Sequence, residues 1–491
     1  MSFWENVAAQ LAYNPEEPIL FNSGFFLYFL LAFMVAYFWL HPYTRLRTKV
    51  FTLFSLYFFY KACGLYVLLV IIAAVLDFNL SNLIYKTTDK LNKKYLLISS
   101  IVINLSLLVY FKYTDFFISI LNDYTFTHIT PLGLILPIGI SFYTFENISY
   151  TIDVYKGQFK PVRSFWDYLF FLSFFPKLVM GPIVRAADFI PQIHKPFVLN
   201  GTDLAKGALL IGGGLVKKVI ISDFIYTNLV QYVFDMPARY SGFECLLAVY
   251  GYAMVIYCDF SGYSDMAIGF GKWLGYDINI NFLSPYQSKN ITEFWRRWHI
   301  SLSSWLRDYL YIPLGGNRLG KSRQYINLFI TMLLGGLWHG ANFTFIIWGA
   351  LHGIALAFDK LRIERNWFDF FPTQNKLGKI LGVLITFHFV CFAWIFFKSD
   401  NVTTAFEMIN QMMIHFGFDT VFTVLAHYKS VVYMILFGFI LHAIPDSIQD
   451  KLALKFQSAP MWTYVVTFVV LIVVLIQFKT TTPVLPIYLQ F

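Results

Sequence analysis

Charged residues are scarce in this chain of 491 residues, because aspartate, glutamate, lysine and arginine together make up only 13% of it. Soluble globular domains contain about 25% charged residues, so this shortage excludes a soluble globule with one polar surface. Hydrophobic residues reach 58% instead, and the mean hydropathy is +0.59. The composition therefore predicts a protein that crosses a membrane several times.

Cysteine is almost absent as well, with four residues in the chain. All of them lie in apolar surroundings without metal-ligand spacing, which predicts buried thiols and argues against a disulfide framework or a zinc site: Cys63, Cys245, Cys258 and Cys391. The chain also lacks a GxSxG elbow, a P-loop and a GxGxxG motif that opens a helix. These absences argue against a serine hydrolase, an NTPase and a dinucleotide-binding enzyme.

The basic residues that give the formal charge of +9 lie mostly in short gaps between apolar runs. No arm or stripe collects them, so they are typical of the cytoplasmic loops of a membrane protein and not of a nucleic-acid-binding surface. We expect no nucleic acid among the partners.

Apolar runs recur along the chain and predict an all-α protein with about eleven to thirteen transmembrane or re-entrant segments. Residues 51–60 and 64–80 are expected to form a hairpin, which would place the basic groups at 45–49 and 86–94 together in the cytoplasm. Residues 165–180 form a short run before Gly181-Pro182, which favours a re-entrant or broken helix. No repeat or long linker divides the chain, so residues 1–491 are expected to form one membrane domain.

Residues 288–353 contain two fragments that differ from ordinary membrane-helix sequence. The first is expected to be one helix over residues 293–311, with a charged face opposite an apolar face that also carries His299. Charges make spanning the bilayer costly, so this helix is expected to lie within or against the cytoplasmic side. In the second fragment His339 follows Gly335-Gly336, where a hydrophobic helix must be interrupted or closely packed.

Ionisable residues at membrane depth are candidates for function. His339 is either a packed histidine bonded to a free carbonyl or a general base that stays neutral near pH 7 and accepts a hydroxyl proton. His299 is either a second catalytic histidine or a structural one beside Asp308 or a serine. His352 is expected to be structural. No pair among these histidines has the i, i+4 spacing of a metal site, so no metal is expected.

Other charged residues leave alternatives open. Asp259 and Asp265 either form a proton or ion relay or satisfy nearby backbone and hydroxyl groups, and we favour a structural or pocket-lining role. Two basic groups either attract cofactor phosphates or belong to plain cytoplasmic loops: Lys217-Lys218, and Arg318, Lys321 and Arg323.

The central motifs, EFWRRWHISLSSWLRDYLYIPLGGNR and LLGGLWHGANFTFIIWGALHG, closely resemble those of the membrane-bound O-acyltransferases. The bacterial branch with alginate O-acetyltransferase is the most similar, and the teichoic-acid D-alanyl transfer protein is more distant. The resemblance extends through PIGISFYTF, FFPKLVMGPIVR and CDFSGYSDMAIG, and the terminal PIYLQF is also similar. It implies a family core at residues 130–360 and a catalytic stretch at residues 288–353.

The resemblance implies a ring of helices around a thinned membrane centre with a tunnel, in which His339 and His299 match the catalytic histidines. Substrate contacts are predicted at Asn290, Trp298, Arg307, Trp338, Asn342 and Asp259. The implied reaction moves an acetyl or short acyl group from a cytoplasmic thioester, acetyl-CoA or another acyl carrier, to a hydroxyl on the outer face. No tightly bound cofactor is expected.

The expected acceptor is a serine of an acetyltransferase partner outside the cytoplasm, which would then modify an exopolysaccharide. The expected location is the cytoplasmic (inner) membrane of a bacterium, in contact with lipid. The alternative is a transporter or exporter component of a polysaccharide secretion system that does no chemistry. That class predicts paired halves with related broken helices, which this sequence does not contain.

Overall fold

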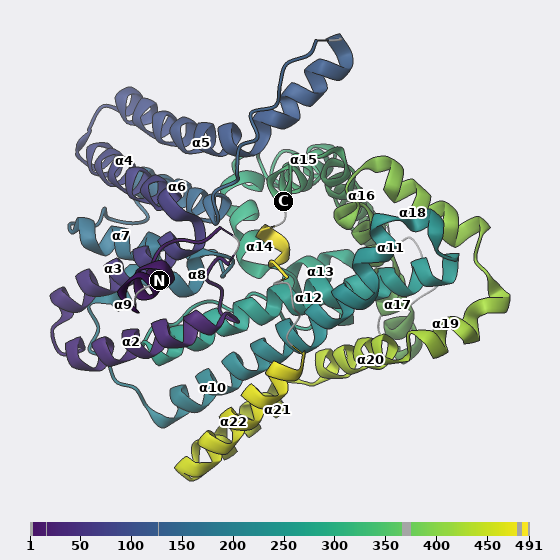
Figure 1. The fold of residues 1–491 in the computed structure, drawn as a ribbon. Helices are drawn as coiled ribbons and strands as arrows, with labels where there is room; N and C mark the ends of the chain where they lie inside the picture. The colour runs from purple at the N-terminus through teal and green to yellow at the C-terminus, as the bar shows by residue number, and fades with distance from the viewer. Residues whose placement is uncertain (1–2, 16, 126, 366–374, 479–483, 490–491) are drawn as a thin grey trace. The chain divides into compact units, whose positions relative to one another are not determined.

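The computed structural model describes residues 3–15, 17–125, 127–365, 375–478 and 484–489, and every regular element within these ranges is a helix. The chain divides into two compact units (Figure 1). Unit 1 comprises Met1–Gly207 and Met266–Asn279, and unit 2 comprises Ala208–Asp265 and Ile280–Phe491. The expectation of one domain over residues 1–491 stays a prediction.

Several helices have the length and composition of membrane spans. Among the described residues five helical runs qualify, and a sixth is added if the bent pair Phe418–His427 and Lys429–Ala443 counts as one span. The five are Thr44–Lys86, Lys90–Thr125, Gly242–Trp273, Phe343–Arg365 and Lys376–Lys398. The predicted class, an all-α multi-pass membrane protein, is therefore confirmed. The larger number of embedded segments and their ring-like arrangement stay predictions.

Unit 1 is built from helices α1 to α9, with the start of α10 and the end of α12. Its elements are α1 (Phe3–Leu11), α2 (Gly24–Leu40), α3 (Thr44–Cys63), α4 (Val67–Lys86), α5 (Lys90–Thr125), α6 (Ile140–Tyr155), α7 (Phe165–Ser173), α8 (Phe175–Leu178) and α9 (Ala186–Ile193). Helix α2 buries a stripe of aromatic residues at helical spacing, Phe26, Phe29, Phe33 and Tyr37. Phe33 packs edge-on against Phe175 of α8, with 5.1 Å between ring centroids.

The hairpin expected from residues 51–60 and 64–80 is confirmed. Helix α3 ends at Cys63, and a single 3₁₀ turn, Gly64–Tyr66, joins it to α4. Gly64 has a φ of 64° and a ψ of −139°, and the chain reverses there. Lys49 of α3 lies 5.9 Å from the ring of Trp166, and Phe78 of α4 lies 5.6 Å from the ring of the adjacent Phe165.

The two basic groups therefore lie at the same end of the hairpin, where Lys49 contacts Trp166 at the start of α7 and Lys93 contacts Tyr155 at the end of α6. Their location in the cytoplasm stays a prediction. Helix α5 continues to Thr125.

The broken helix expected at residues 165–180 is confirmed. Helix α7 ends at Ser173 and the short α8 begins at Phe175, with Pro176 in its first turn. The buried Lys177 of α8 forms an ion pair with Glu146 of α6, and the backbone N–H of Val184 donates to the same carboxylate at 3.1 Å. Burial inside protein is the condition under which irregular backbone is tolerated at membrane depth.

Unit 2 contains the remaining helices. They are α10 (Gly201–Leu215), which begins in unit 1, two π-helical segments (η2, Val216–Asp223, and η3, Tyr226–Val230), α11 (Gln231–Asp235), α12 (Gly242–Trp273), α13 (Ile291–Arg297), α14 (Ile300–Leu306), α15 (Lys321–His339), α16 (Phe343–Arg365), α17 (Lys376–Lys398), α18 (Val402–Ile414), α19 (Val421–His427), α20 (Lys429–Ala443), α21 (Asp446–Gln457) and α22 (Met461–Phe478).

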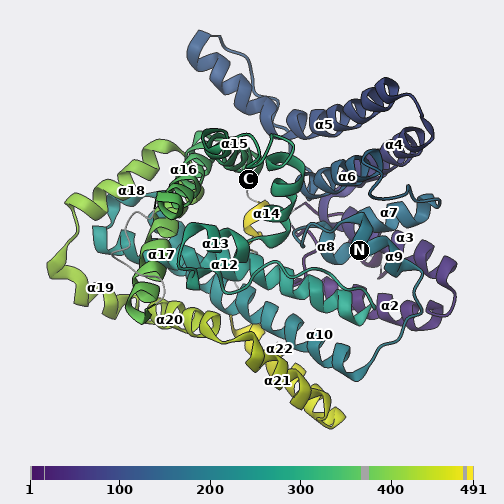
Figure 2. The same ribbon diagram turned by 180° about the vertical axis from the view of Figure 1, so that it is seen from behind.

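Helices α15 and α16 lie side by side in unit 2 (Figure 1, Figure 2). Glycines make this close approach possible, because a Cβ added at Gly336 would lie 2.3 Å from the carbonyl oxygen of Phe345 and 3.0 Å from the Cα of Gly349. Of the two outcomes expected at Gly335-Gly336, the structure shows close packing. Helix α15 runs through both glycines and ends at His339.

The contact at Gly336 generates a stability prediction. Gly336→Ala should destabilise the protein by about 1–3 kcal/mol, because overpacking forces two helix backbones apart. The matched control is Gly213→Ala in α10, where an added Cβ meets nothing within 4 Å. The control should be neutral or slightly stabilising through helix propensity. Thermal unfolding of both purified variants provides the measurement, and equal midpoints would contradict the prediction.

Candidate active site

The helix expected over residues 293–311 is wrong, because it is broken at His299. Helix α13 ends at Arg297, α14 begins at Ile300, and residues Arg307–Tyr311 form a π-helical turn (η6). His299 adopts a left-handed conformation with φ of 44°, which is uncommon for a residue with a side chain. His299 therefore does not lie on the apolar face of one continuous helix, where we expected it.

Asn281 stabilises this break from a preceding loop. Its backbone carbonyl accepts the N–H of Ile300 at 3.0 Å, and its side-chain Oδ1 accepts the N–H of Ser301 at 3.2 Å. These bonds satisfy donors at the start of α14 that have no partner within the helix. The local sequence around His299 contains no glycine or proline that marks the break, since its partner lies 18 residues earlier.

The imidazole of His299 is fully buried, and Asn281 determines which nitrogen carries the proton. Because the backbone N–H of Ser301 donates to Oδ1 of Asn281, that atom is the amide oxygen and acts only as an acceptor. His299 Nδ1 lies 3.2 Å from the same oxygen and therefore donates to it. Nε2 is left with its lone pair available and has no hydrogen-bond partner among the described residues.

Burial also keeps His299 neutral. Loss of solvent lowers the pKa of its imidazole from 6.5 to about 3. At neutral pH the ring is therefore uncharged, in surroundings that include the aromatic rings of Phe260 and Trp338. This is the protonation state that a general base or a hydrogen-bond acceptor requires.

His339 is the last residue of α15 and is also buried. The helix stops there because Gly340 is extended and packs so closely on Phe345 that a Cβ would lie 2.0 Å from the ring. Aromatic rings surround the imidazole, with Trp348 and Phe397 at centroid distances of 5.1 and 5.2 Å. The break expected near His339 thus falls after it.

Two aromatic side chains connect the histidines. The Trp338 ring lies 4.9 Å from His339 and 6.2 Å from His299, measured between centroids. Tyr488 lies 5.4 Å from His339 and 6.1 Å from His299. All four residues belong to unit 2, so the structure brings His299, His339 and Trp338 together as a cluster.

Tyr488 was not predicted as a site residue. It belongs to the short turn Ile487–Leu489 (η8), and its ring also packs on Phe260 at 4.4 Å between centroids. The resemblance of the PIYLQF segment to the membrane-bound O-acyltransferases was the only signal in the sequence that could have identified Tyr488 as a site residue. Nothing local in that segment indicates that it reaches residues 299 and 339.

The two asparagines predicted to contact substrate have structural partners. Asn290 caps α13, because its Oδ1 accepts the N–H of Glu293 at 2.8 Å. Asn342 accepts the N–H of Thr344 at 3.0 Å and donates to the carbonyl of Asp400 at 2.6 Å. Their roles in substrate binding stay predictions.

Trp298 and Arg307 lie in contrasting environments. Trp298 is buried against the rings of Phe282 and Trp394, with centroids 5.0 and 5.1 Å away. Arg307 is exposed and pairs with Asp308 at 2.7 Å. Their substrate contacts also stay predictions. His352, for which a structural role is expected, accepts the indole N–H of Trp295 at 3.3 Å.

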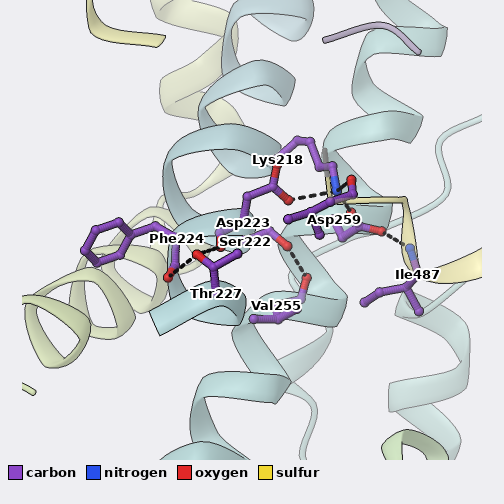
Figure 3. Close-up of polar contacts among 9 residues, drawn as sticks. Lys218, Ser222, Asp223, Phe224, Thr227, Val255, Asp259 and Ile487 are labelled. Carbon is purple, nitrogen blue, oxygen red and sulfur yellow. Dashed lines mark hydrogen bonds and ion pairs between the residues drawn. The ribbon is translucent and has the colours of Figure 1, made fainter. Parts of the chain in front are cut away.

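The two lysines at 217 and 218 do not form a loop. They lie in η2 of unit 2 and pair with the aspartates of α12. Figure 3 shows the pair of Lys218 and Asp259. Lys217 lies 2.6 Å from Asp265, and the buried Lys218 lies 2.5 Å from Asp259. Asp259 was predicted to line a pocket and contact substrate; that contact stays a prediction. No group of three or more metal-ligating side chains occurs within the described ranges.

Comparisons with known proteins assign this arrangement to a family. Residues 162–406 match the model of the membrane-bound O-acyltransferase (MBOAT) family, and this range includes His299 and His339. The peptidoglycan O-acetyltransferase of Helicobacter pylori is 38% identical over 425 residues, which cover 80% of both chains. The probable alginate O-acetylase AlgI of Pseudomonas aeruginosa is 44% identical over 66% of this chain and 61% of that protein.

A more distant relative is the teichoic acid D-alanyltransferase of Bacillus subtilis, 32% identical over 55% of this chain and 71% of that protein. The chain belongs to the membrane-bound O-acyltransferase family and is an acyltransferase. The enzyme is therefore favoured over the alternative of a transport component without chemistry. As an acyltransferase it requires an acyl donor.

Asn281 can be tested as the residue that orients His299. Asn281→Leu removes the acceptor for Nδ1–H, so we expect acyl transfer to fall about 10-fold or more as the imidazole loses its fixed tautomer. Ser264→Ala is the control, because it removes only the acceptor of the Asn281 amide N–H₂ at 3.2 Å and leaves Oδ1 in place. Turnover should be measured on folded, purified protein. Full activity of Asn281→Leu would contradict this role.

The buried His299 also predicts a pH dependence of stability. Its folded pKa of about 3 lies below the unfolded value of 6.5, so the unfolded state binds the proton more readily. The contribution to stability is complete above about pH 6.5 and is lost as the pH falls toward 3. The His299→Gln variant lacks this pH-dependent contribution to the free energy of unfolding. From pH 7.5 to 4.5 the wild type should therefore lose about 2–3 kcal/mol more than the variant, measured by chemical unfolding. Parallel losses would contradict the assignment.

Proposed function

We propose that this enzyme transfers an acetyl or other short acyl group from a cytoplasmic thioester, acetyl-CoA or an acyl carrier, to a hydroxyl acceptor on the outer face of the membrane. The observation that carries the proposal is the pair of buried histidines, His299 and His339, that flank the same two rings, Trp338 and Tyr488. The names of the relatives add support, since they act on peptidoglycan and alginate.

His339 acts as the general base in this proposal. It accepts the proton of the acceptor hydroxyl while the oxygen attacks the thioester carbonyl carbon. The carbon–sulfur bond then breaks, and the thiolate leaves and takes up the proton. A thioester is reactive enough that positioning and one base supply much of the required acceleration.

His299 supports the same step through its available Nε2 lone pair, which can hold the acceptor hydroxyl or a proton in transit. The rings of Trp338 and Tyr488 keep water from the thioester, and their N–H and O–H groups are of the type that stabilises a developing oxyanion. The exposed Arg307 is suited to the phosphates of a donor, in competition with its partner Asp308.

The proposed biological role is O-acetylation of an exopolysaccharide or another cell-envelope polymer, from the cytoplasmic membrane of a bacterium. A separate acetyltransferase outside the cytoplasm, with a serine hydroxyl as acceptor, is the proposed partner. The acyl donor is a substrate in this proposal: it binds, gives up its acyl group and leaves as the free thiol. Proton transfer by imidazole side chains needs no resident cofactor for this chemistry.

The proposal predicts that His339→Ala abolishes transfer in a folded protein. We expect a loss of about 10²–10⁴-fold, the scale of removing a proton-transfer group. The measurement is release of free CoA from radiolabelled acetyl-CoA by protein in lipid vesicles, with base-labile acetate on isolated envelope polymers as the cellular measurement. His415→Ala changes an exposed histidine in the same unit and should retain activity.

Two outcomes would overturn parts of the proposal. Near-normal CoA release by His339→Ala protein that elutes as a folded species contradicts the role of the imidazole. A wild-type protein that leaves acetyl-CoA intact, while cells that carry it gain envelope acetyl groups, contradicts acetyl-CoA as the donor.

A further inference from the structure

A buried ionic cluster joins η2 to α12 in unit 2 (Figure 3). Lys218 lies 2.5 Å from Asp259 and 2.8 Å from Asp223, and all three side chains are almost inaccessible to solvent. Gly262 allows the two elements to approach, because a Cβ there would lie 2.7 Å from the carbonyl oxygen of Gly214. Burying charges is costly, and a well-packed apolar contact would join two helices at least as well. The cluster therefore calls for a further explanation.

The cluster also binds the backbone of residues 484–489. The second carboxylate oxygen of Asp259 accepts the backbone N–H of Ile487 at 2.8 Å (Figure 3). Lys218 also donates to the backbone carbonyl of Val484 at 3.3 Å. The ammonium group thus donates to Asp259 and Val484 and forms an ion pair with Asp223. Residues 484–489 include an irregular segment whose buried backbone groups would otherwise lack partners.

This attachment determines the position of Tyr488. Ile487 is held by Asp259, and the next side chain along the segment packs on Phe260, the residue that follows Asp259 in α12. The same ring lies between His299 and His339. Tyr488 therefore directly follows the residue that Asp259 binds, and its ring lies beside both histidines.

We propose that Asp259 and Lys218 are positioning residues that hold residues 484–489 so that Tyr488 forms a wall of the two-histidine site. This inference rests on the proposed function for its link to the reaction. Asp259 then acts through Ile487 and Tyr488, and does not touch the substrate.

The neighbouring pair offers a matched control. Lys217 and Asp265 have the same chemistry, lie 2.6 Å apart and join the same two elements. Among the described contacts, no hydrogen bond joins that pair to residues 484–489. Asp265→Asn therefore removes an equivalent ion pair without releasing the segment.

The first experiment measures the position of the segment without any need for activity. Ile487→Cys places a thiol at a buried position, and Leu485→Cys places one at an exposed position, in protein that lacks the four native cysteines. We expect Asp259→Asn to increase the rate of maleimide labelling at residue 487 several-fold, while labelling at 485 stays the same. Asp265→Asn should leave both rates unchanged. A protected residue 487 in Asp259→Asn protein would overturn the attachment.

The second experiment tests the link to the reaction. Asp259→Asn should lower kcat by roughly 10²-fold, the effect of misplacing a site wall by about 1 Å, with little change in the KM for acetyl-CoA. Tyr488→Ala should cause a similar loss, and the double variant should lose no more than Tyr488→Ala alone. Independent, multiplying losses would overturn the proposal that Asp259 acts through Tyr488.

A third variant remains informative if Asp259→Asn does not fold. Ile487→Pro removes the N–H that Asp259 accepts, together with the isoleucine side chain, and leaves the ionic cluster intact. It should lower kcat in the same way, and full activity would overturn the proposal. If wild-type protein shows the expected labelling pattern but consumes no thioester, the proposed function fails while the attachment stands.

Discussion

Asn281 carries the interaction on which the site depends. Its backbone and side chain together bind four groups around His299: the N–H of Ile300, the N–H and the hydroxyl of Ser301, and the imidazole Nδ1. A left-handed backbone at a non-glycine residue costs about 1–3 kcal/mol, and these bonds offset that cost. The same residue therefore redirects the chain between α13 and α14 and selects the tautomer of the ring. If α13 and α14 were continuous, His299 would be one more residue on a helix face.

The rest of the cluster follows from how buried polar groups find partners in an apolar interior. His299 avoids the cost of desolvating a charge by staying neutral. Lys218 and Asp259 instead stay paired and bind the backbone of a distant segment. In both places a side chain supplies the bonds that irregular backbone requires. The two-histidine cluster and the segment at residues 484–489 thus satisfy their buried polar groups in the same way.

The helices are interrupted where a side chain or the backbone turns toward the protein interior. The breaks at Phe174, His299 and Gly340 all lie in buried surroundings. The π-helical segments η2 and η6 follow the same tendency, since η2 carries the lysines that meet α12. Regular helices supply the apolar exterior of such a protein, and the interruptions supply its chemistry.

The sequence by itself determined the class of the protein, because composition and apolar run length report directly on the solvent that the chain must face. It also identified the broken helix near residue 174, since Pro176 and the short apolar run are local signals, and it selected His299 and His339 as candidates because ionisable residues are rare in such stretches. Only the tertiary structure decided the rest. The left-handed turn at His299 depends on Asn281, and the place of Tyr488 depends on Lys218 and Asp259. These contacts join residues that are far apart in the chain, and local propensity contains no information about them.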